Sequence, residues 1–239
     1  MAAMRAGRAA HITFVTKNGT QTTVFSQDSG TDGGRQVITI DSTVHTTVLL
    51  INGVGYVEGN EAALATFFGF APSEAGSLAG RWISFQPGDT AGATGYTAVT
   101  AGITLASVSG EVTLTGGLTL TGPARIDGRA VIGVRGTPTG SQAAGLRATL
   151  YVAATGQPLP VSYQIDSQGY QDTVTFGQWG EALNLSAPAG AIPASSLRPV
   201  TALSVAAARP HQRPRGGNRV LLTSPRRGCR QRRPGCPCR

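Results

Sequence analysis

The feature that most constrains this chain is a strict alternation of threonine with valine, isoleucine or leucine, which recurs through residues 1–197. A period of two places one set of side chains on each face of a β-sheet. The alternating segments are short, and the turns between the first five are too short for a parallel crossover. Asn18-Gly19 and Asp127-Gly128 are type I′ hairpin signals. The sequence therefore predicts a strongly curved antiparallel sheet of about ten strands.

Helical periodicity interrupts the strands after residue 59. Asn60 is a good helix N-cap. Apolar residues then follow at the spacing of one helical face, at Leu64, Phe67, Phe68 and Ala71. Pro72 ends this helix, a second short helix is expected over residues 73–80, and residues 96–109 fit a helix loosely. The predicted fold class is α+β: a curved antiparallel half-barrel sheet with two or three helices over its concave face.

Aromatic residues gather around this helical insert, and they are the sharpest apolar feature of the chain. Such a cluster either forms a packed core between helix and sheet or lines an apolar ligand cavity. The sequence leaves both interpretations open. The candidate cavity residues are Leu64, Phe67, Phe68, Phe70, Trp82, Phe85 and Ile103.

The formal charge of +8 is unevenly distributed along the chain. Residues 198–239 contain 11 arginines and no acid, whereas residues 1–197 carry nine basic and twelve acidic residues. The body is therefore slightly acidic, and we expect no specific nucleic-acid partner. We predict one domain over residues 1–197 and a disordered, Arg/Pro/Gly-rich basic tail over residues 198–239.

Three interpretations of the tail remain open. It is a solvated extension, a segment that binds nucleic acid or an anionic membrane, or the product of an out-of-frame reading. The last interpretation is motivated by the use of 19 arginines and one lysine in the whole chain, which suggests a GC-rich coding sequence.

No group of residues predicts catalysis. The only histidines of residues 1–197 are His11 and His45, and we interpret His45, in mid-strand beside Thr47, as a structural or surface histidine. The acidic residues are scattered singly, and three cysteines in the tail, Cys229, Cys236 and Cys238, are a weak basis for a metal site. We therefore predict no catalytic residue, no metal and no cofactor, and the protein is not expected to be an enzyme.

Several loose motifs, taken in order, resemble one family. They are GVGYVEGN at residues 53–60, FFG at 67–69, LAGRWI at 78–83, IDGR at 126–129, LYVAATGQPLP at 150–160 and TFGQWG at 175–180. This set resembles the secreted actinobacterial lipoproteins of the LppX/LprG type, which have a LolA-like fold. The resemblance spans residues 8–197.

The resemblance implies a half-barrel whose helices and concave sheet face enclose a hydrophobic cavity. Residues 60–71 and 81–85 would then belong to the cavity wall. The better-known members carry lipids or glycolipids across the cell envelope. The resemblance thus predicts a monomeric, non-enzymatic cell-envelope protein that binds a lipid or another apolar small molecule. The alternative is a structural or protein-interaction envelope module with a filled core.

The two ends of the domain carry further expectations. Residues 1–10 have no apolar signal segment and no lipobox cysteine, so we expect them to form at most the end of the family's first helix. Membrane association would then require an N-terminal lipid anchor missing from this chain. The expected location is the cell envelope or the extracellular space by resemblance, with the cytoplasm as the alternative. No apolar run reaches ~18 residues, so no transmembrane helix is expected, and regular structure should fade after Pro188.

Overall fold

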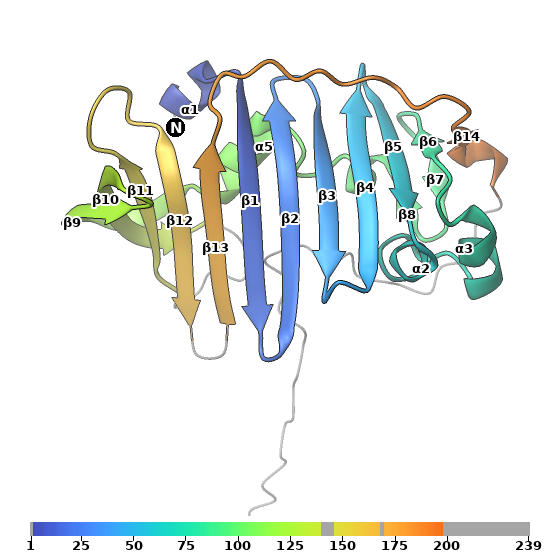
Figure 1. Cartoon of the computed structure of the whole chain (residues 1–239), viewed down its shortest axis with the longest axis horizontal. Coiled ribbons are helices and arrows are strands. Elements are labelled where there is room, and N and C mark those ends of the chain that lie inside the picture. The colour runs from blue at the N-terminus through green and yellow to red at the C-terminus, as the bar shows by residue number, and fades with distance from the viewer. Residues whose placement is uncertain (1, 140–145, 168–169, 198–239) are drawn as a thin grey trace, which may run out of the picture.

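The computed structural model describes residues 2–139, 146–167 and 170–197. Its centre is a sheet of twelve strands in the order β14-β6-β5-β4-β3-β2-β1-β13-β12-β11-β10-β9. In the part of the chain that the structure describes, the helices that follow the first five strands lie behind this sheet or beside its edge in Figure 1, and the opposite face is turned to the viewer. The fold class predicted from sequence, α+β with a curved antiparallel sheet under helices, is confirmed, and the sheet stays open.

The first half of the sheet is a meander of five strands. They are β1 (Ala9–Asn18), β2 (Gln21–Gly30), β3 (Gly34–Ile40), β4 (Val44–Ile51) and β5 (Val54–Gly59). The second half contains β9 (Leu114–Ile126), β10 (Arg129–Pro138), β11 (Ala148–Ala153), β12 (Pro160–Ser167) and β13 (Tyr170–Gly177). The halves join where β1 pairs antiparallel with β13, so the first and the last long strand are neighbours.

The strand expected over residues 81–85 is present as β6, and three short strands that the sequence did not predict, β7, β8 and β14, raise the number of strands. The segment over residues 86–95 contains a small hairpin of β7 (Thr90–Ala91) and β8 (Thr94–Gly95). β6 (Ile83–Phe85) pairs with β5, and β14 (Ile192–Pro193) pairs parallel with β6. Residues 188–197 are therefore structured, and the expected loss of order after Pro188 is wrong.

Local sequence fixes the strand register at one of the two predicted hairpin turns, and strand pairing decides it at the other. Asp127 and Gly128 have φ values of 48° and 77°, as a type I′ turn requires, and Ile126 pairs with Arg129. At the first hairpin Asn18 pairs with Gln21, so the central residues are Gly19 and Thr20. The predicted Asn18-Gly19 turn is displaced by one residue, because the pairing of the long strands outweighs the local preference of Asn18.

The helices are short. They are α1 (Ala2–Ala6), α2 (Glu61–Phe68), α3 (Pro72–Leu78), α4 (Tyr96–Val99) and α5 (Leu105–Glu111), with a 3-10 turn at Ala194–Ser196. α2 ends before the predicted residue 71, because Gly69 adopts a left-handed conformation with φ 67° and closes the helix. None of the described helices is both long and apolar enough to cross a membrane.

Residues 178–191 form an extended segment along one end of the sheet, drawn in orange at the top of Figure 1. It is held at both ends, since the Gly180 N–H donates to the Ala9 carbonyl at 2.8 Å and the Ile192 N–H donates to the Trp82 carbonyl at 2.8 Å. This strap explains how β13, in the middle of the sheet, is followed in sequence by β14 at its edge.

Candidate ligand cavity

The floor of the site is the inward face of strands β1 to β4. Phe14 on β1 lies opposite Phe25 on β2, and their rings meet edge to face with centroids 6.3 Å apart. Phe25 in turn lies opposite Ile38 on β3. Directly opposed residues share a face of a sheet, so these buried side chains form one apolar surface below the helices.

Helix α2 supplies the opposite wall. The Asn60 side chain accepts a hydrogen bond of 2.9 Å from the Ala63 N–H, which fixes the start of the helix. Phe67 and Phe68 are buried, and their rings also meet edge to face, at 6.4 Å. A Cβ atom on Gly59 would lie 3.2 Å from the Ala63 Cβ, so glycine at the end of β5 allows α2 to approach the sheet closely.

The segment between α4 and α5 covers the remaining side. The Gln27 side chain, 1% exposed, donates to the Gly102 carbonyl at 2.7 Å, with the Ile103 carbonyl at 3.2 Å. A Cβ atom on Gly34 would lie 2.8 Å from the Ile103 Cγ2. A polar anchor on β2 and a glycine on β3 therefore hold this segment against the sheet.

These three parts enclose a cavity of about 190 Å³. Its lining is mostly apolar, and the described residues that contribute are Phe14, Phe25, Gln27, Gln36, Ile38, Val48, Phe67, Phe68, Thr94, Ala98, Val99, Ala101, Gly102 and Glu111. Cavities for drug-sized ligands have volumes of roughly 300–1,000 Å³. The cavity as it stands therefore has room for a small ring or for one end of a longer apolar chain.

The residues proposed from the sequence lie in different places. Phe67 and Phe68 line the cavity. Four others are buried in the hydrophobic core outside its lining: Leu64, Phe70, Phe85 and Ile103. Trp82 is only partly buried, and its carbonyl accepts the Ile192 N–H.

The floor of the cavity was not among the residues proposed from the sequence. Phe14 and Phe25 lie far in sequence from the aromatic residues of the helical insert, so no local pattern connects them with that cluster. A usable signal was present on the same strands: in β2, Phe25, Gln27 and Ser29 alternate on one face, and Gln27 and Ser29 are buried polar residues there. A polar side chain on an inward face indicates a partner across the layer.

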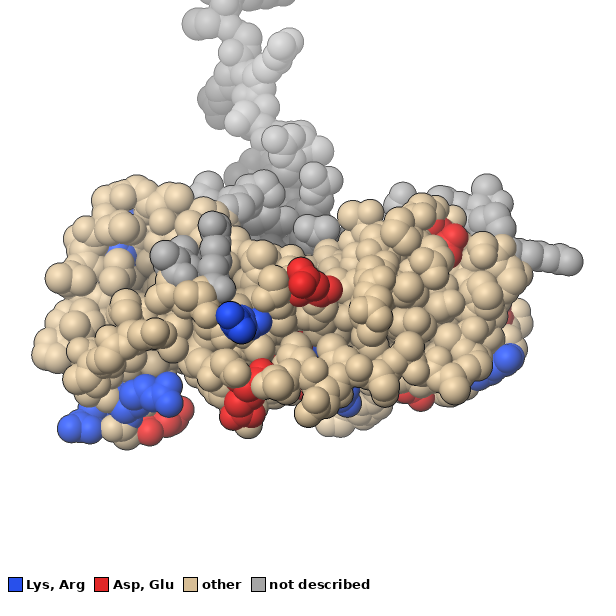
Figure 2. All heavy atoms as spheres, turned by 90° about the horizontal axis from the view of Figure 1, so that it is seen from above, with Lys and Arg blue, Asp and Glu red and all other residues tan. Residues whose placement is uncertain are grey.

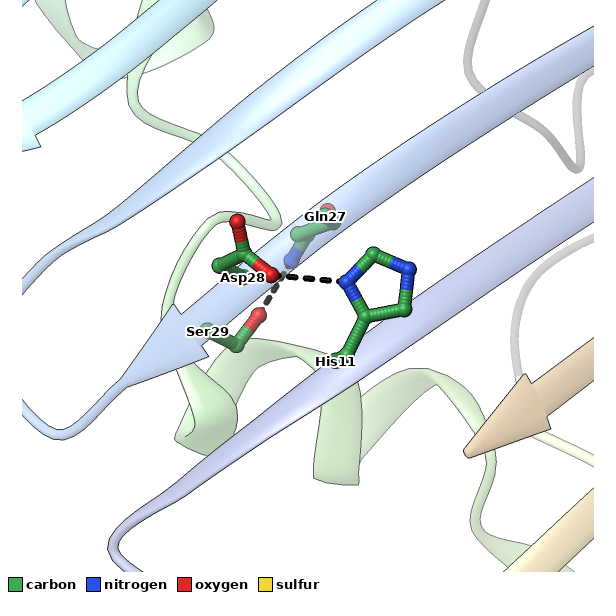
Figure 3. A network of polar contacts seen from close by, with 4 residues as sticks. All are labelled: His11, Gln27, Asp28 and Ser29. Carbon is green, nitrogen blue, oxygen red and sulfur yellow. Dashed lines mark hydrogen bonds and ion pairs between the residues drawn. The ribbon is translucent and has the colours of Figure 1, made fainter. Parts of the chain in front are cut away.

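The histidines lie away from the cavity. His11 Nδ1 is 2.7 Å from Asp28 Oδ1, and both side chains are about one-third exposed on the face opposite to Gln27 and Ser29 (Figure 3). With Arg35 and the strap they border a separate pocket of about 260 Å³. His45, predicted as a structural or surface histidine, is exposed, and its Nε2 is 2.8 Å from the Ser42 carbonyl oxygen.

Within residues 2–139, 146–167 and 170–197, no three His, Cys, Asp or Glu residues come together in a way that could hold a metal ion. The three cysteines lie outside the described residues. Burial, and then the nearby Asp172 carboxylate, raise the pKa of Tyr163 above its ordinary value. The Tyr163 hydroxyl has no hydrogen-bond partner among the described residues.

Comparison with known proteins gives matches only among solved structures. No protein-family model and no curated protein matches the chain. LprF from Mycobacterium bovis is 17% identical, with 79% of this chain and 93% of that chain covered and a TM-score of 0.47. The lipoprotein LppX from Mycobacterium tuberculosis is 14% identical, with 77% of this chain and 99% of that chain covered and a TM-score of 0.46. A LolA superfamily protein from Nitrosomonas europaea is 10% identical, with 76% of this chain and 92% of that chain covered and a TM-score of 0.27.

The chain resembles LppX-type lipoproteins with a LolA-like fold. LppX and a LolA superfamily protein, the kinds of protein that the sequence motifs resemble, are among these structural neighbours. At 10–17% identity the likeness concerns the course of the chain and does not extend to a ligand. What the cavity binds has to be inferred from the residues that line it.

Proposed function

We propose that this chain is a non-enzymatic protein of the cell envelope that binds an apolar ligand, a lipid or a lipid-like molecule, between the sheet and the helices. The observation that carries the proposal is the cavity between Phe14 and Phe25 on the sheet and Phe67 and Phe68 on α2. Removing apolar surface from water contributes about 25 cal/mol per Å², so such a ligand binds without any charged group.

The volume of the cavity limits which part of the ligand it can hold. About 190 Å³ accommodates a small ring or the terminal part of an acyl chain. A longer ligand has to extend beyond the present cavity or move the segment that carries Ala98 and Ala101. Both alanines are exposed and also contribute to the lining, so they mark the side on which the cavity meets the surface.

The small volume also favours a second candidate, a structural or protein-interaction module with a filled core. In that case the cavity is a packing imperfection between short helices and a curved sheet. The two candidates differ in one measurable property: only the first predicts saturable binding of an apolar molecule at a site that a bulky residue can block.

The experiment uses the full chain and the fluorescent probe N-phenyl-1-naphthylamine, together with mass spectrometry of lipid extracted from the purified protein. Ala98→Trp and Ala101→Trp fill the cavity from its exposed side, and we expect each to weaken probe binding roughly tenfold or more. Ala106→Trp, at an exposed position of α5 outside the lining, is the matched control and should bind like the wild type.

Salt should change the affinity little, since the contact is apolar. Saturable binding that both lining variants reduce supports the carrier. Non-saturable partitioning, equal in all variants and without extracted lipid, contradicts it and leaves the filled-core module.

A further inference from the structure

A continuous row of cross-strand neighbours connects the floor of the cavity with the far edge of the sheet. Each residue in the row lies directly opposite the next: Phe25, Phe14, Val174, Tyr163, Leu150, Val134 and Leu120. Opposed residues share a face, so Leu120 on the edge strand β9 lies on the same face as the cavity floor. The row is apolar throughout, apart from the buried hydroxyl of Tyr163.

The two ends of this row differ in exposure. At the cavity end Phe14 and Phe25 are each 4% exposed. At the edge Leu120 is 75% exposed, Leu118 54% and Ile132 36%. These are the large hydrophobic residues exposed in the part of the chain that the structure describes. Leu118 and Ile132 each lie two residues from a member of the row, so the three side chains form one exposed apolar patch on the β9–β10 hairpin.

Basic residues accompany this patch. The hairpin contains Arg125, Arg129 and Arg135 against one acidic residue, Asp127, although residues 1–197 together have an excess of acid. The Arg125 side chain donates to the Gly128 carbonyl at 2.9 Å, which holds it at the turn. Figure 2 shows basic side chains gathered at the end of the molecule that carries β9 and β10.

The edge of β9 is poorly suited to pairing with another strand. Pro123 has no N–H to donate, and Gly116 and Gly122 have φ values of 77° and 82°. The pairing of β9 with β10 contains two register shifts. Proline and irregularities of this kind protect natural edge strands from strand addition. The hairpin therefore fits a surface better than it fits an extended peptide.

We propose that the β9–β10 hairpin docks this protein on an anionic lipid bilayer. Leu118, Leu120 and Ile132 enter the interface between headgroups and acyl chains, and Arg125, which pairs with Ala130 on the same face as Ile132, meets the lipid phosphates. An anionic bilayer is the partner that offers negative charge above an apolar layer. This docking goes beyond the proposed ligand binding and does not require it, although the apolar row would give a lipid a continuous path toward the cavity.

The first test measures insertion at a defined residue. Leu120→Trp is compared with Thr119→Trp, its neighbour on the opposite face, in the full chain with phosphatidylglycerol-containing vesicles whose acyl chains carry bromine. The fluorescence of the wild type, which contains two tryptophans, is the blank. We expect bromine to quench Trp at position 120 roughly twofold more than Trp at position 119. Equal quenching at both positions overturns the proposal.

The second test separates the hairpin from the arginines of residues 198–239. Vesicle co-sedimentation of Leu118→Ser/Leu120→Ser is compared with Thr119→Ser/Thr121→Ser at low and at high salt. Electrostatic binding through the tail falls with salt, whereas apolar insertion persists. We expect the leucine variant to bind roughly tenfold more weakly at high salt, and the threonine variant to bind like the wild type.

Three outcomes contradict docking. The first is equal binding of both variants to the vesicles, and the second is no binding to anionic vesicles. The third is a dimer that forms without vesicles and that the leucine substitutions abolish, because the patch would then bind a second copy of the chain. No apolar probe is present in either test. Failure of docking is therefore distinguishable from failure of ligand binding.

Discussion

Gln27 and Gln36 lie directly opposite each other on β2 and β3, and the Gln36 Nε2 donates a hydrogen bond of 2.6 Å to the Gln27 Oε1. The Gln27 Nε2 in turn donates to the Ser29 Oγ at 2.5 Å and to the Gly102 carbonyl at 2.7 Å. This network joins two strands of the sheet to the segment that covers the cavity. A buried polar group that is fully bonded fixes one arrangement of the layers.

Gln27→Met should destabilise the protein by about 1–3 kcal/mol, because it leaves the Gly102 carbonyl and the Gln36 amide without their partner. The double variant Gln27→Met/Gln36→Met should lose less free energy of unfolding than the two single variants lose together, since both ends of the Gln27–Gln36 hydrogen bond are then apolar. Urea unfolding of the four proteins measures this coupling. Strict additivity would mean that the two glutamines do not act together.

The cost of truncating aromatic residues should distinguish lining from packed core. Phe85 is fully buried outside the cavity lining, so Phe85→Ala should cost about 4–5 kcal/mol. Phe67 and Phe68 already have open space beside them. Phe68→Ala and Phe67→Ala should therefore each lower the free energy of unfolding by about 3 kcal/mol or less. Denaturant unfolding gives these values. A cost of ~4 kcal/mol or more at both Phe67 and Phe68 would instead favour a filled core.

Tyr163→Phe should stabilise the protein at neutral pH by about 1 kcal/mol, because it removes a buried hydroxyl that has no partner in the part of the chain that the structure describes. The effect should grow at alkaline pH. The pKa of Tyr163 is raised in the folded state, so above pH ~10 the unfolded chain loses this proton while the folded chain keeps it. Stability of the wild type therefore falls as pH rises through that range, and the variant should lose less.

Thermal unfolding from neutral pH to pH ~11 checks both parts of this prediction. Tyr56→Phe, on the other face of the sheet and only partly buried, is the control. A destabilised Tyr163→Phe at neutral pH would show that the hydroxyl has a partner.

The predicted tail should contribute nothing to the stability of the domain. A chain that ends at Leu197 keeps β14 and the buried Ala194, so its melting temperature should lie within about 2 °C of that of the full chain. Calorimetry of the two chains measures the difference. Loss of a cooperative transition after truncation would place the domain boundary beyond residue 197.

Local chemistry determined the parts of this fold that depend on a few neighbouring residues. The period-two alternation predicted the long strands, and Asp127-Gly128 forms the predicted type I′ turn. The Asn60 side chain caps α2 by accepting a hydrogen bond from the Ala63 N–H. These features were predictable because backbone preference and capping act within three or four residues. The antiparallel class followed from the short connections alone.

Tertiary structure decided the long-range strand pairings and the cavity, because both depend on the burial of whole sheet and helix faces. The pairing of β1 with β13 and the return of residues 192–193 to β6 join segments more than 100 residues apart, for which no local signal exists. The same holds for the cavity: α2 sets Phe67 and Phe68 opposite Phe14 and Phe25, while Phe85 enters the packed core. The periodicity of the sequence predicts which residues face inward. Only the register of the strands and the packing of the helices decide which of these residues line the cavity and which pack in the core.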